Sequence, residues 1–102
     1  MMYQRQTDGL PPIHPGEILG DELAALGLSA AEFGRRLAVP HNRITAILKG
    51  QRAVTADTAL RLGRFFGMPA KFWLDLQQTY DLKRAEAEHG AEIDRVVRPR
   101  AA

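Results

Sequence analysis

The sequence of 102 residues contains no cysteine. This absence excludes disulfides, thiol catalysis and cysteine-based zinc sites, and it is typical of proteins in a reducing cytosol. No stretch approaches the roughly 18 consecutive apolar residues of a membrane-spanning helix. The first 12 residues also lack the apolar core of a signal peptide. We therefore expect a cytoplasmic protein with no membrane partner.

Motifs for catalysis and for cofactor binding are also missing. Ser29 is the only serine, and its spacing from Glu32 is that of a helix-capping box. The histidines, His14, His41 and His89, do not form an H-E-x-x-H motif, and there is no P-loop or dinucleotide fingerprint. The sequence therefore predicts no catalytic residue, no metal site and no cofactor, and it favours a binding protein over an enzyme.

The net charge is only +2, but the charge is unevenly distributed. Between Phe33 and Ala56 there are five basic residues and no acidic residue, which leaves a net charge of −3 on the rest of the chain. We call residues 33–56 the basic window; its cations are Arg35, Arg36, Arg43, Lys49 and Arg52. A local basic surface is typical of a site for a polyanion, although a solvated charged face would have the same composition.

Helical spacing of apolar residues predicts the first three helices. The first begins at Pro15, which suits the first helical position, and Gly27 can end it in a left-handed conformation. The second is capped by Ser29, and Pro40 stops it. The third runs from His41 to Gly50, with one apolar face.

Two further helices complete the prediction. Thr55 is a suitable N-cap for the fourth, and Gly63 within that helix predicts a close approach by another segment. The fifth is expected from about Ala70 to about Glu88. Because no segment alternates as a strand would, the sequence predicts an all-α fold of five helices.

The second and third helices are short and are joined at Ala38-Val39-Pro40, which is the pattern of a helix-turn-helix. Such helix pairs also occur in all-α domains that bind no DNA. In a DNA reader, the N-terminal residues of the second helix of the motif meet base edges. The predicted base contacts are His41, Asn42, Arg43 and Thr45. The predicted phosphate contacts are Arg35, Arg36, Lys49, Gln51 and Arg52.

Three segments carry a family resemblance: "PPIHPGEIL", "LGLSAAEFGRRLAVPHNRITAILKGQRAVTADTALRLGRFFG" and "PAKFWLDLQQTYDL". Together they resemble the HigA antitoxin family (VapI/HigA-like), part of the Xre/Cro/C1-type helix-turn-helix proteins. The resemblance implies a lambda-repressor-like fold with an extended C-terminal helix. It also implies base-facing roles for His41, Asn42 and Thr45, and base or backbone contacts for Arg43 and Lys49.

The resemblance further implies an antitoxin that binds a mRNA-cleaving, HigB/RelE-like toxin and represses their shared operon as a homodimer on double-stranded operator DNA. The domain organisation then predicted is a flexible arm at 1–12, a DNA-binding domain at 13–67, a C-terminal helix for dimerisation or partner contact at 68–90, and a tail at 91–102.

The fifth helix contains more large apolar residues than one stripe on a small core requires. The predicted dimer interface is therefore Phe72, Trp73, Leu76 and Tyr80, although Trp73 could equally fill the core. Nothing in the sequence locates the toxin contact.

Two departures from the family pattern leave alternatives open. Relatives often have a polar residue where this chain has Ala30, and Ser or Thr where it has Pro40. Both changes remove a side chain that could bind phosphate. A toxin-binding module that no longer reads DNA, or a solitary Xre-type regulator without a toxin, therefore remain alternatives to the operator-binding antitoxin.

Overall fold

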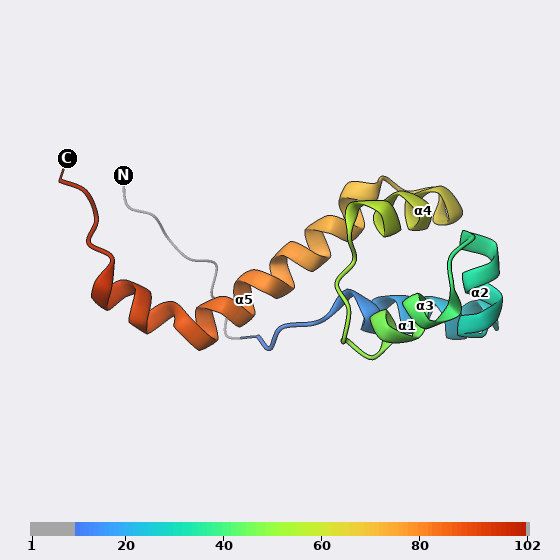
Figure 1. The fold of residues 1–102 in the computed structure, drawn as a ribbon, viewed down its shortest axis with the longest axis horizontal. Helices are drawn as coiled ribbons and strands as arrows, with labels where there is room; N and C mark the ends of the chain where they lie inside the picture. Colours follow the sequence, from blue (N-terminus) through green and yellow to red (C-terminus); the bar gives the residue numbers. More distant parts are fainter. Residues whose placement is uncertain (1–9, 102) are drawn as a thin grey trace.

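The computed structural model describes residues 10–101, and every regular element within them is an α-helix. The helices are α1 (Pro15–Leu26), α2 (Ala30–Leu37), α3 (His41–Leu48), α4 (Ala56–Phe66) and α5 (Ala70–Val96). Helices α1–α4 and the start of α5 form a compact body, from which the rest of α5 projects (Figure 1). The prediction of five helices in an all-α fold is confirmed.

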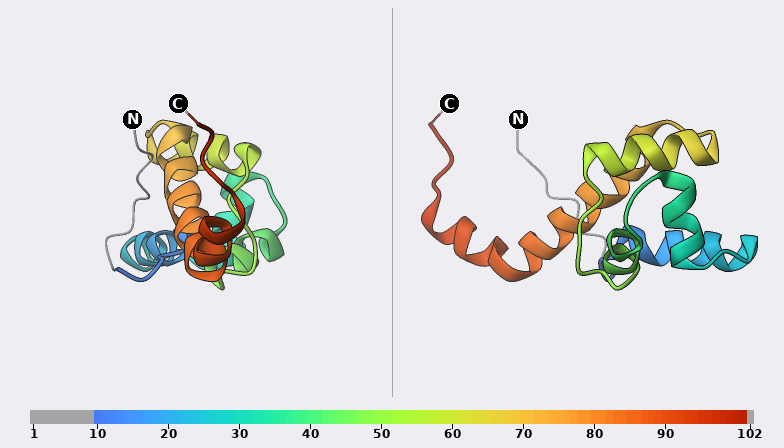
Figure 2. Two further views of the ribbon diagram at one scale, coloured as in Figure 1. Left: turned by 90° about the vertical axis from the view of Figure 1, so that its left-hand side faces the viewer. Right: turned by 45° about the vertical axis from the view of Figure 1, so that its right-hand side comes forward.

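The length of α5 makes the molecule elongated. Its principal extents are 53 × 22 × 21 Å, and its radius of gyration is 16.8 Å, whereas a compact chain of this size would have a radius of gyration of about 13 Å. A helix of 27 residues is about 40 Å long. The second half of α5 therefore extends well beyond the other four helices, as the right-hand view of Figure 2 also shows.

One apolar core holds the compact body together. Phe33 of α2 lies at its centre, with its ring centroid 5.0 Å from that of Phe65 and 5.9 Å from that of Phe66. Trp73 of α5 extends this cluster, 5.7 Å from Phe66 between centroids. Leu19, Ile44, Ile47 and Leu62 are also fully buried. Every helix thus contributes at least one side chain to a shared core.

The start of α1 is joined closely to the end of α3. His14 is the N-cap of α1, and its Nδ1 accepts a hydrogen bond of 2.9 Å from the backbone N–H of Gly16. A Cβ atom at Gly16 would lie 1.9 Å from the carbonyl oxygen of Ile47, a separation that no side chain could occupy. The sequence "HPGE" therefore caps α1 and lets its first turn rest against α3.

Gly63 allows a second close approach, as its position in the sequence predicts. A Cβ atom there would lie 2.5 Å from the carbonyl oxygen of Met68, in the turn between α4 and α5. A buried side chain then ties α5 to the loop before α4, because Oε1 of Gln77 accepts a hydrogen bond of 2.8 Å from the backbone N–H of Val54. The first half of α5 is therefore held by specific contacts.

Three local predictions need correction or lie outside the described residues. Helix α5 continues to Val96, eight residues beyond Glu88, so the first six residues of the predicted tail are helical. Thr55 occupies the N-cap position of α4, but its side chain makes no capping hydrogen bond. The predicted arm lies mostly in residues 1–9, outside the described part of the chain, and residues 10–12 have no regular secondary structure.

The extension of α5 has a local physical cause. Arg84 pairs with Glu88, one turn further along the helix. Arg95 also pairs with Glu92. Side-chain pairs at these spacings stabilise a helix without tertiary packing. Among the described helices, none is long and apolar enough to cross a bilayer.

Candidate nucleic-acid interface

Helix α2 and helix α3 meet through a tight turn. Ala38 ends α2 with a positive φ of 59°, and the N–H of Val39 bonds the carbonyl of Gly34 at 2.9 Å. Gly34 permits this turn, because a Cβ atom there would lie 3.0 Å from the carbonyl oxygen of Val39. The Ser29 hydroxyl caps the other end of α2 by accepting a hydrogen bond from the N–H of Glu32 at 3.1 Å. The helix-turn-helix geometry is therefore set by local contacts.

Helix α3 has one buried face and one open face. Ile44 and Ile47 are fully buried, whereas His41 and Asn42 are exposed at the N-terminal end. Thr45 is partly exposed, and its hydroxyl donates a hydrogen bond of 3.1 Å to the carbonyl of His41. These predicted base contacts thus lie on a helix end that is free to enter a groove.

Arg43 lies on the flank of α3 and already has a partner. Its Nη1 is 2.8 Å from Oδ2 of Asp57, and Nε of Arg61 is 2.9 Å from the same oxygen. Hydrogen bonds from Arg61 and then from Arg43 hold the pKa of the Asp57 carboxyl below its ordinary value. Arg43 is therefore the one predicted base contact that the structure places in an ion pair.

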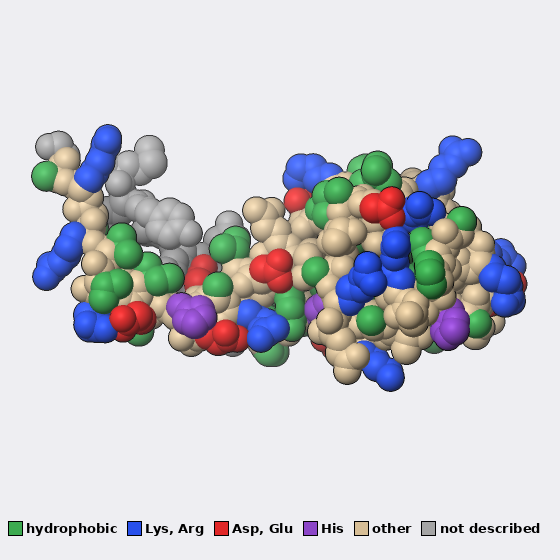
Figure 3. Space-filling view, viewed as in Figure 1, with side chains coloured by type: hydrophobic (Ala, Val, Ile, Leu, Met, Phe, Trp, Pro, Cys, Tyr) green, Lys and Arg blue, Asp and Glu red, His purple; other side chains and the backbone are tan. Residues whose placement is uncertain are grey.

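The predicted phosphate contacts divide into two groups. Arg35 and Arg36 are exposed, but both form ion pairs with the Glu32 carboxylate. The backbone N–H of Glu32 is the group that the Ser29 hydroxyl caps. Lys49, Gln51 and Arg52 are exposed after α3, and within residues 10–101 neither cation has a carboxylate partner. We call the part of α5 from about residue 82 onward outer α5. The basic side chains gather over the compact body, whereas acidic and basic side chains interleave along outer α5 (Figure 3).

Two acidic residues pair with cations of the basic window, although neither lies within residues 33–56. Glu32 directly precedes Phe33, and Asp57 directly follows Ala56, so both lie one residue outside it. The i, i+3 and i, i+4 spacings could have revealed the pairs of Glu32 with Arg35 and Arg36. The Arg43–Asp57 pair joins residues on different helices, so no local spacing indicated it.

The positions that depart from the family pattern have structural roles of their own. Ala30 is partly buried and packs against the core. Pro40 is the exposed N-cap of α3, and no side-chain hydrogen bond caps that helix. Both positions therefore preserve the fold while supplying no polar side chain.

Known proteins share this arrangement. A helix-turn-helix family model matches residues 20–73. Virulence-associated protein I from Dichelobacter nodosus is 52% identical over 80 residues, which cover 78% of this chain and 74% of that protein. The structure of an addiction module antidote protein of the HigA family from Coxiella burnetii has a TM-score of 0.87 and 52% identity, covering 89% of this chain and 100% of that one. This chain belongs to the HigA family.

Two further antitoxins of similar structure have been solved together with DNA. Antitoxin HigA from Pseudomonas aeruginosa, solved with the higBA promoter, is 43% identical with a TM-score of 0.85, covering 88% of this chain and 99% of that one. Antitoxin GraA, solved in complex with its operator, is 41% identical with a TM-score of 0.88, covering 96% and 100%. HigA antitoxins are DNA-binding proteins and not enzymes.

The predicted dimer residues of this HigA-family chain lie mainly within its own fold. Trp73 is 1% exposed, so it fills the core and offers no surface to a second chain, which corrects its assignment to the interface. Phe72 and Leu76 are partly buried against the same core. Tyr80 is also partly buried, with its ring edge-on to His14 at 4.9 Å between centroids. These four residues therefore lie in the first half of α5, where the helix packs against the compact body.

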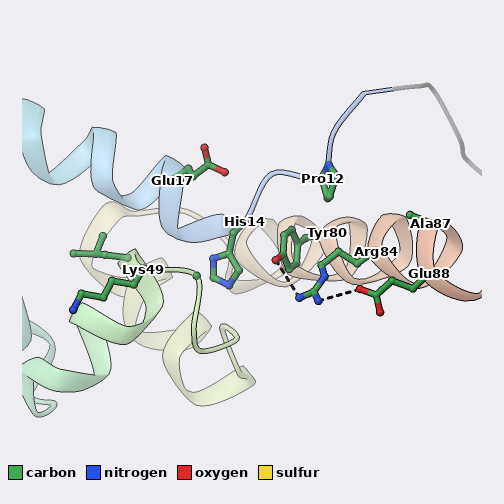
Figure 4. A pocket seen from close by; sticks show the side chains of 10 residues that line it. Pro12, His14, Glu17, Lys49, Tyr80, Arg84, Ala87 and Glu88 are labelled. Carbon is green, nitrogen blue, oxygen red and sulfur yellow. Dashed lines mark hydrogen bonds and ion pairs between the residues drawn. The ribbon is translucent and has the colours of Figure 1, made fainter.

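Tyr80 lines a hollow where α1, α3 and α5 meet (Figure 4). The hollow has a volume of about 610 Å³. Nη1 of Arg84 donates a hydrogen bond of 3.3 Å to the Tyr80 hydroxyl, and its Nη2 is 3.0 Å from Oε1 of Glu88. Burial lowers the pKa of His14 at the inner wall, so its neutral imidazole is favoured as the cap of α1.

Proposed function

We propose that this HigA-family chain represses its own operon by binding operator DNA with the open face of α3. His41, Asn42 and Thr45 would meet base edges in the major groove, where Asn can form two hydrogen bonds with adenine. Lys49, Gln51 and Arg52 would bind phosphates. The observation that carries this proposal is the exposed polar end of α3 beside two cations that have no carboxylate partner among the described residues.

The same observation argues against the alternative in which this chain only binds a toxin and no longer reads DNA. Ala30 and Pro40 each lack a polar side chain, but His41, Asn42 and Thr45 remain on accessible parts of α3. The relatives named above that are described with a promoter or an operator share 43% and 41% identity with this chain. Because operator DNA is cytoplasmic, the proposed function places the protein in the cytoplasm.

We also propose that the chain acts as a homodimer, paired through outer α5. Leu82, Ile93 and Val96 are 46%, 45% and 54% exposed. Leu82, Ile93 and Val97 line an apolar hollow of about 450 Å³ along α5, and unpartnered apolar surface of this kind is typical of an interface. A twofold dimer would place two α3 helices about 34 Å apart on successive half-sites.

The second half of the proposed function is neutralisation of a mRNA-cleaving toxin of the HigB/RelE type. Membership of the HigA family supports it, and α1 supplies a fitting surface for a basic partner. Glu17, Asp21 and Glu22 are exposed on this helix, which contains no basic residue. Expression of the neighbouring gene should arrest growth, and co-expression of this chain should restore it. Arrest that persists despite co-expression would exclude neutralisation of that gene product.

Operator binding is tested by fluorescence anisotropy on a duplex from upstream of the gene and on a scrambled duplex, across a salt series. The parent should prefer the upstream duplex and lose affinity steeply as salt rises. Asn42→Ala should weaken specific binding by about tenfold to a hundredfold, the range for one bidentate base contact. Gln78→Ala, an exposed amide on α5, is the matched control and should change nothing. Equal affinity of the parent for both duplexes would contradict the proposal.

A further inference from the structure

The Arg43–Asp57 pair raises the question of what this contact does on a DNA-reading helix. Arg43 is partly buried, whereas the other four cations of the basic window are exposed. Its side chain is 24% exposed, against 71% for Arg35. Nη1 of Arg43 lies 2.8 Å from Oδ2 of Asp57, so the guanidinium is directed toward the start of α4.

A second arginine connects this pair to the turn of the helix-turn-helix. Arg61 bonds the same Asp57 oxygen through Nε at 2.9 Å, while its Nη1 donates to the carbonyl of Leu37 at 2.8 Å. The same nitrogen is 3.4 Å from the carbonyl oxygen of Ala38, the residue with positive φ. Asp57 therefore contacts α3 through Arg43 and is linked through Arg61 to the end of α2.

Stability alone is a weak explanation for this arrangement. The Asp57 side chain is 58% exposed, and exposed ion pairs contribute little to stability. A single cation matters far more on a surface that binds DNA. Each additional phosphate contact strengthens binding to every sequence and makes binding more dependent on salt. An arginine on α3 that binds phosphate would therefore add affinity without adding discrimination.

We propose that Asp57 is a specificity-determining residue that withholds Arg43 from the phosphate backbone. This inference rests on the proposed operator binding. The Asp57 carboxylate satisfies the Arg43 guanidinium in the way that a phosphate would, because both groups accept hydrogen bonds through anionic oxygens. Sequence-independent contacts are then left to the cations after α3, and the base-facing residues decide which sequence is bound.

The test uses Asp57→Asn in the full chain, because this change removes the charge while keeping the shape of the side chain. Anisotropy is measured on the upstream and scrambled duplexes across the salt series. Affinity for the scrambled duplex should rise about three- to tenfold, and the slope of log affinity against log salt should become steeper by about one. The ratio of upstream to scrambled affinity should fall accordingly.

Two matched variants separate this mechanism from a general gain in positive charge. Asp75→Asn removes an exposed carboxylate that pairs with Lys71 on α5, so the net charge changes equally. It should leave the scrambled affinity within about twofold of the parent value, because no cation of the basic window is released. Adding Arg43→Gln to Asp57→Asn should restore the slope of the parent protein.

The outcomes distinguish this inference from the proposed function. A parent that binds both duplexes equally would overturn the proposed function and this inference with it. A parent that prefers the upstream duplex, with equal shifts in Asp57→Asn and Asp75→Asn, would overturn this inference alone. If circular dichroism shows that Asp57→Asn does not fold, the single variant Arg43→Gln tests the inference instead. It should leave the salt slope unchanged, and a slope lower by about one would show that Arg43 binds phosphate.

Discussion

The compact body and outer α5 maintain their structures by different means. In the body, side chains such as Phe33 and Trp73 are almost completely buried, and Gly16 and Gly63 allow backbone contacts too close for any other residue. Beyond about residue 82, α5 instead presents Leu82 and Ile93 to solvent, and pairs such as Arg84–Glu88 run along its surface. The body is complete within one chain, whereas outer α5 has an apolar face available for a partner.

This difference matters for the proposed function. A DNA-reading surface requires side chains held at defined positions, and the core holds α3 through Ile44 and Ile47. A dimer interface requires apolar area that is exposed until the second chain arrives. Changes in the body should therefore affect folding, and equivalent changes in outer α5 should affect assembly.

The largest contrast is expected between two leucines. Leu62 is fully buried, so Leu62→Ala should lower the free energy of unfolding by about 2–5 kcal/mol. Leu82 is 46% exposed, so Leu82→Ala should change the unfolding of the monomer by less than about 0.5 kcal/mol and should weaken self-association. Urea denaturation and sedimentation would measure the two effects. Equal losses of stability would contradict the proposed division between body and outer helix.

The next contrast lies between two glycines in α1. A Cβ atom at Gly16 would lie 1.9 Å from the Ile47 carbonyl oxygen, so Gly16→Ala should destabilise the body by about 3 kcal/mol. At Gly20 a Cβ atom would lie 3.8 Å from Cδ2 of Leu48, an ordinary contact, so Gly20→Ala should stabilise the helix by about 0.5–1 kcal/mol. Thermal unfolding should show a lower melting temperature for Gly16→Ala and a higher one for Gly20→Ala. A Gly16→Ala variant as stable as the parent would contradict the close contact of α1 with α3.

A smaller effect is expected from pH, and it should arise in the body. Burial lowers the pKa of His14 below its ordinary value of 6.5, despite opposing contributions from the backbone of Arg52 and from Asp81 and Glu17. Because the unfolded chain binds the proton more readily, this contribution to stability is present above about pH 6.5 and is lost as pH falls through the lower pKa of the folded state.

The matched variant for this pH effect is His14→Asn. An asparagine can still accept a hydrogen bond at an N-cap but does not titrate. As the pH is lowered, the melting temperature of this variant should therefore fall less than that of the parent. Identical pH dependence in both proteins would show that another group is responsible.

The smallest effect is expected from added salt on outer α5. The Arg84–Glu88 and Arg95–Glu92 pairs are exposed, so screening should weaken them. Circular dichroism of dilute protein should show a slight loss of helicity with salt, while the urea midpoint of the body stays nearly constant. A large fall in the urea midpoint would indicate that these surface pairs support the whole fold.

The sequence predicted the body better than outer α5, for a physical reason. Caps and helix starts depend on neighbouring residues, so Pro15, Gly27 and Ser29 could be assigned from local chemistry. The end of α5 could not, because exposed polar residues continue a helix without an apolar stripe. Trp73 was ambiguous because its burial depends on how the turn after α4 folds α5 back against the ring of Phe66, and the spacing of apolar residues along α5 does not reveal that angle.

The candidate site shows the same limit. The spacing of α2 and α3 was enough to predict a helix-turn-helix and the open face around Asn42. The charge of that face was overestimated, because the Asp57 carboxylate at the start of α4 reaches Arg43 of α3 only in the folded chain. His14 was also missed as the cap of α1, because histidine is not among the common N-cap residues.

The most direct test of the account is hydrogen exchange of the free protein and of the protein with its upstream duplex. If the open face of α3 reads DNA, the duplex should slow amide exchange at residues 41–55, which comprise α3 and the following loop. Exchange on the acidic face of α1 should not change. Unchanged exchange at 41–55, with slowing elsewhere in the body, would contradict the claim that the open face of α3 is the DNA-reading surface.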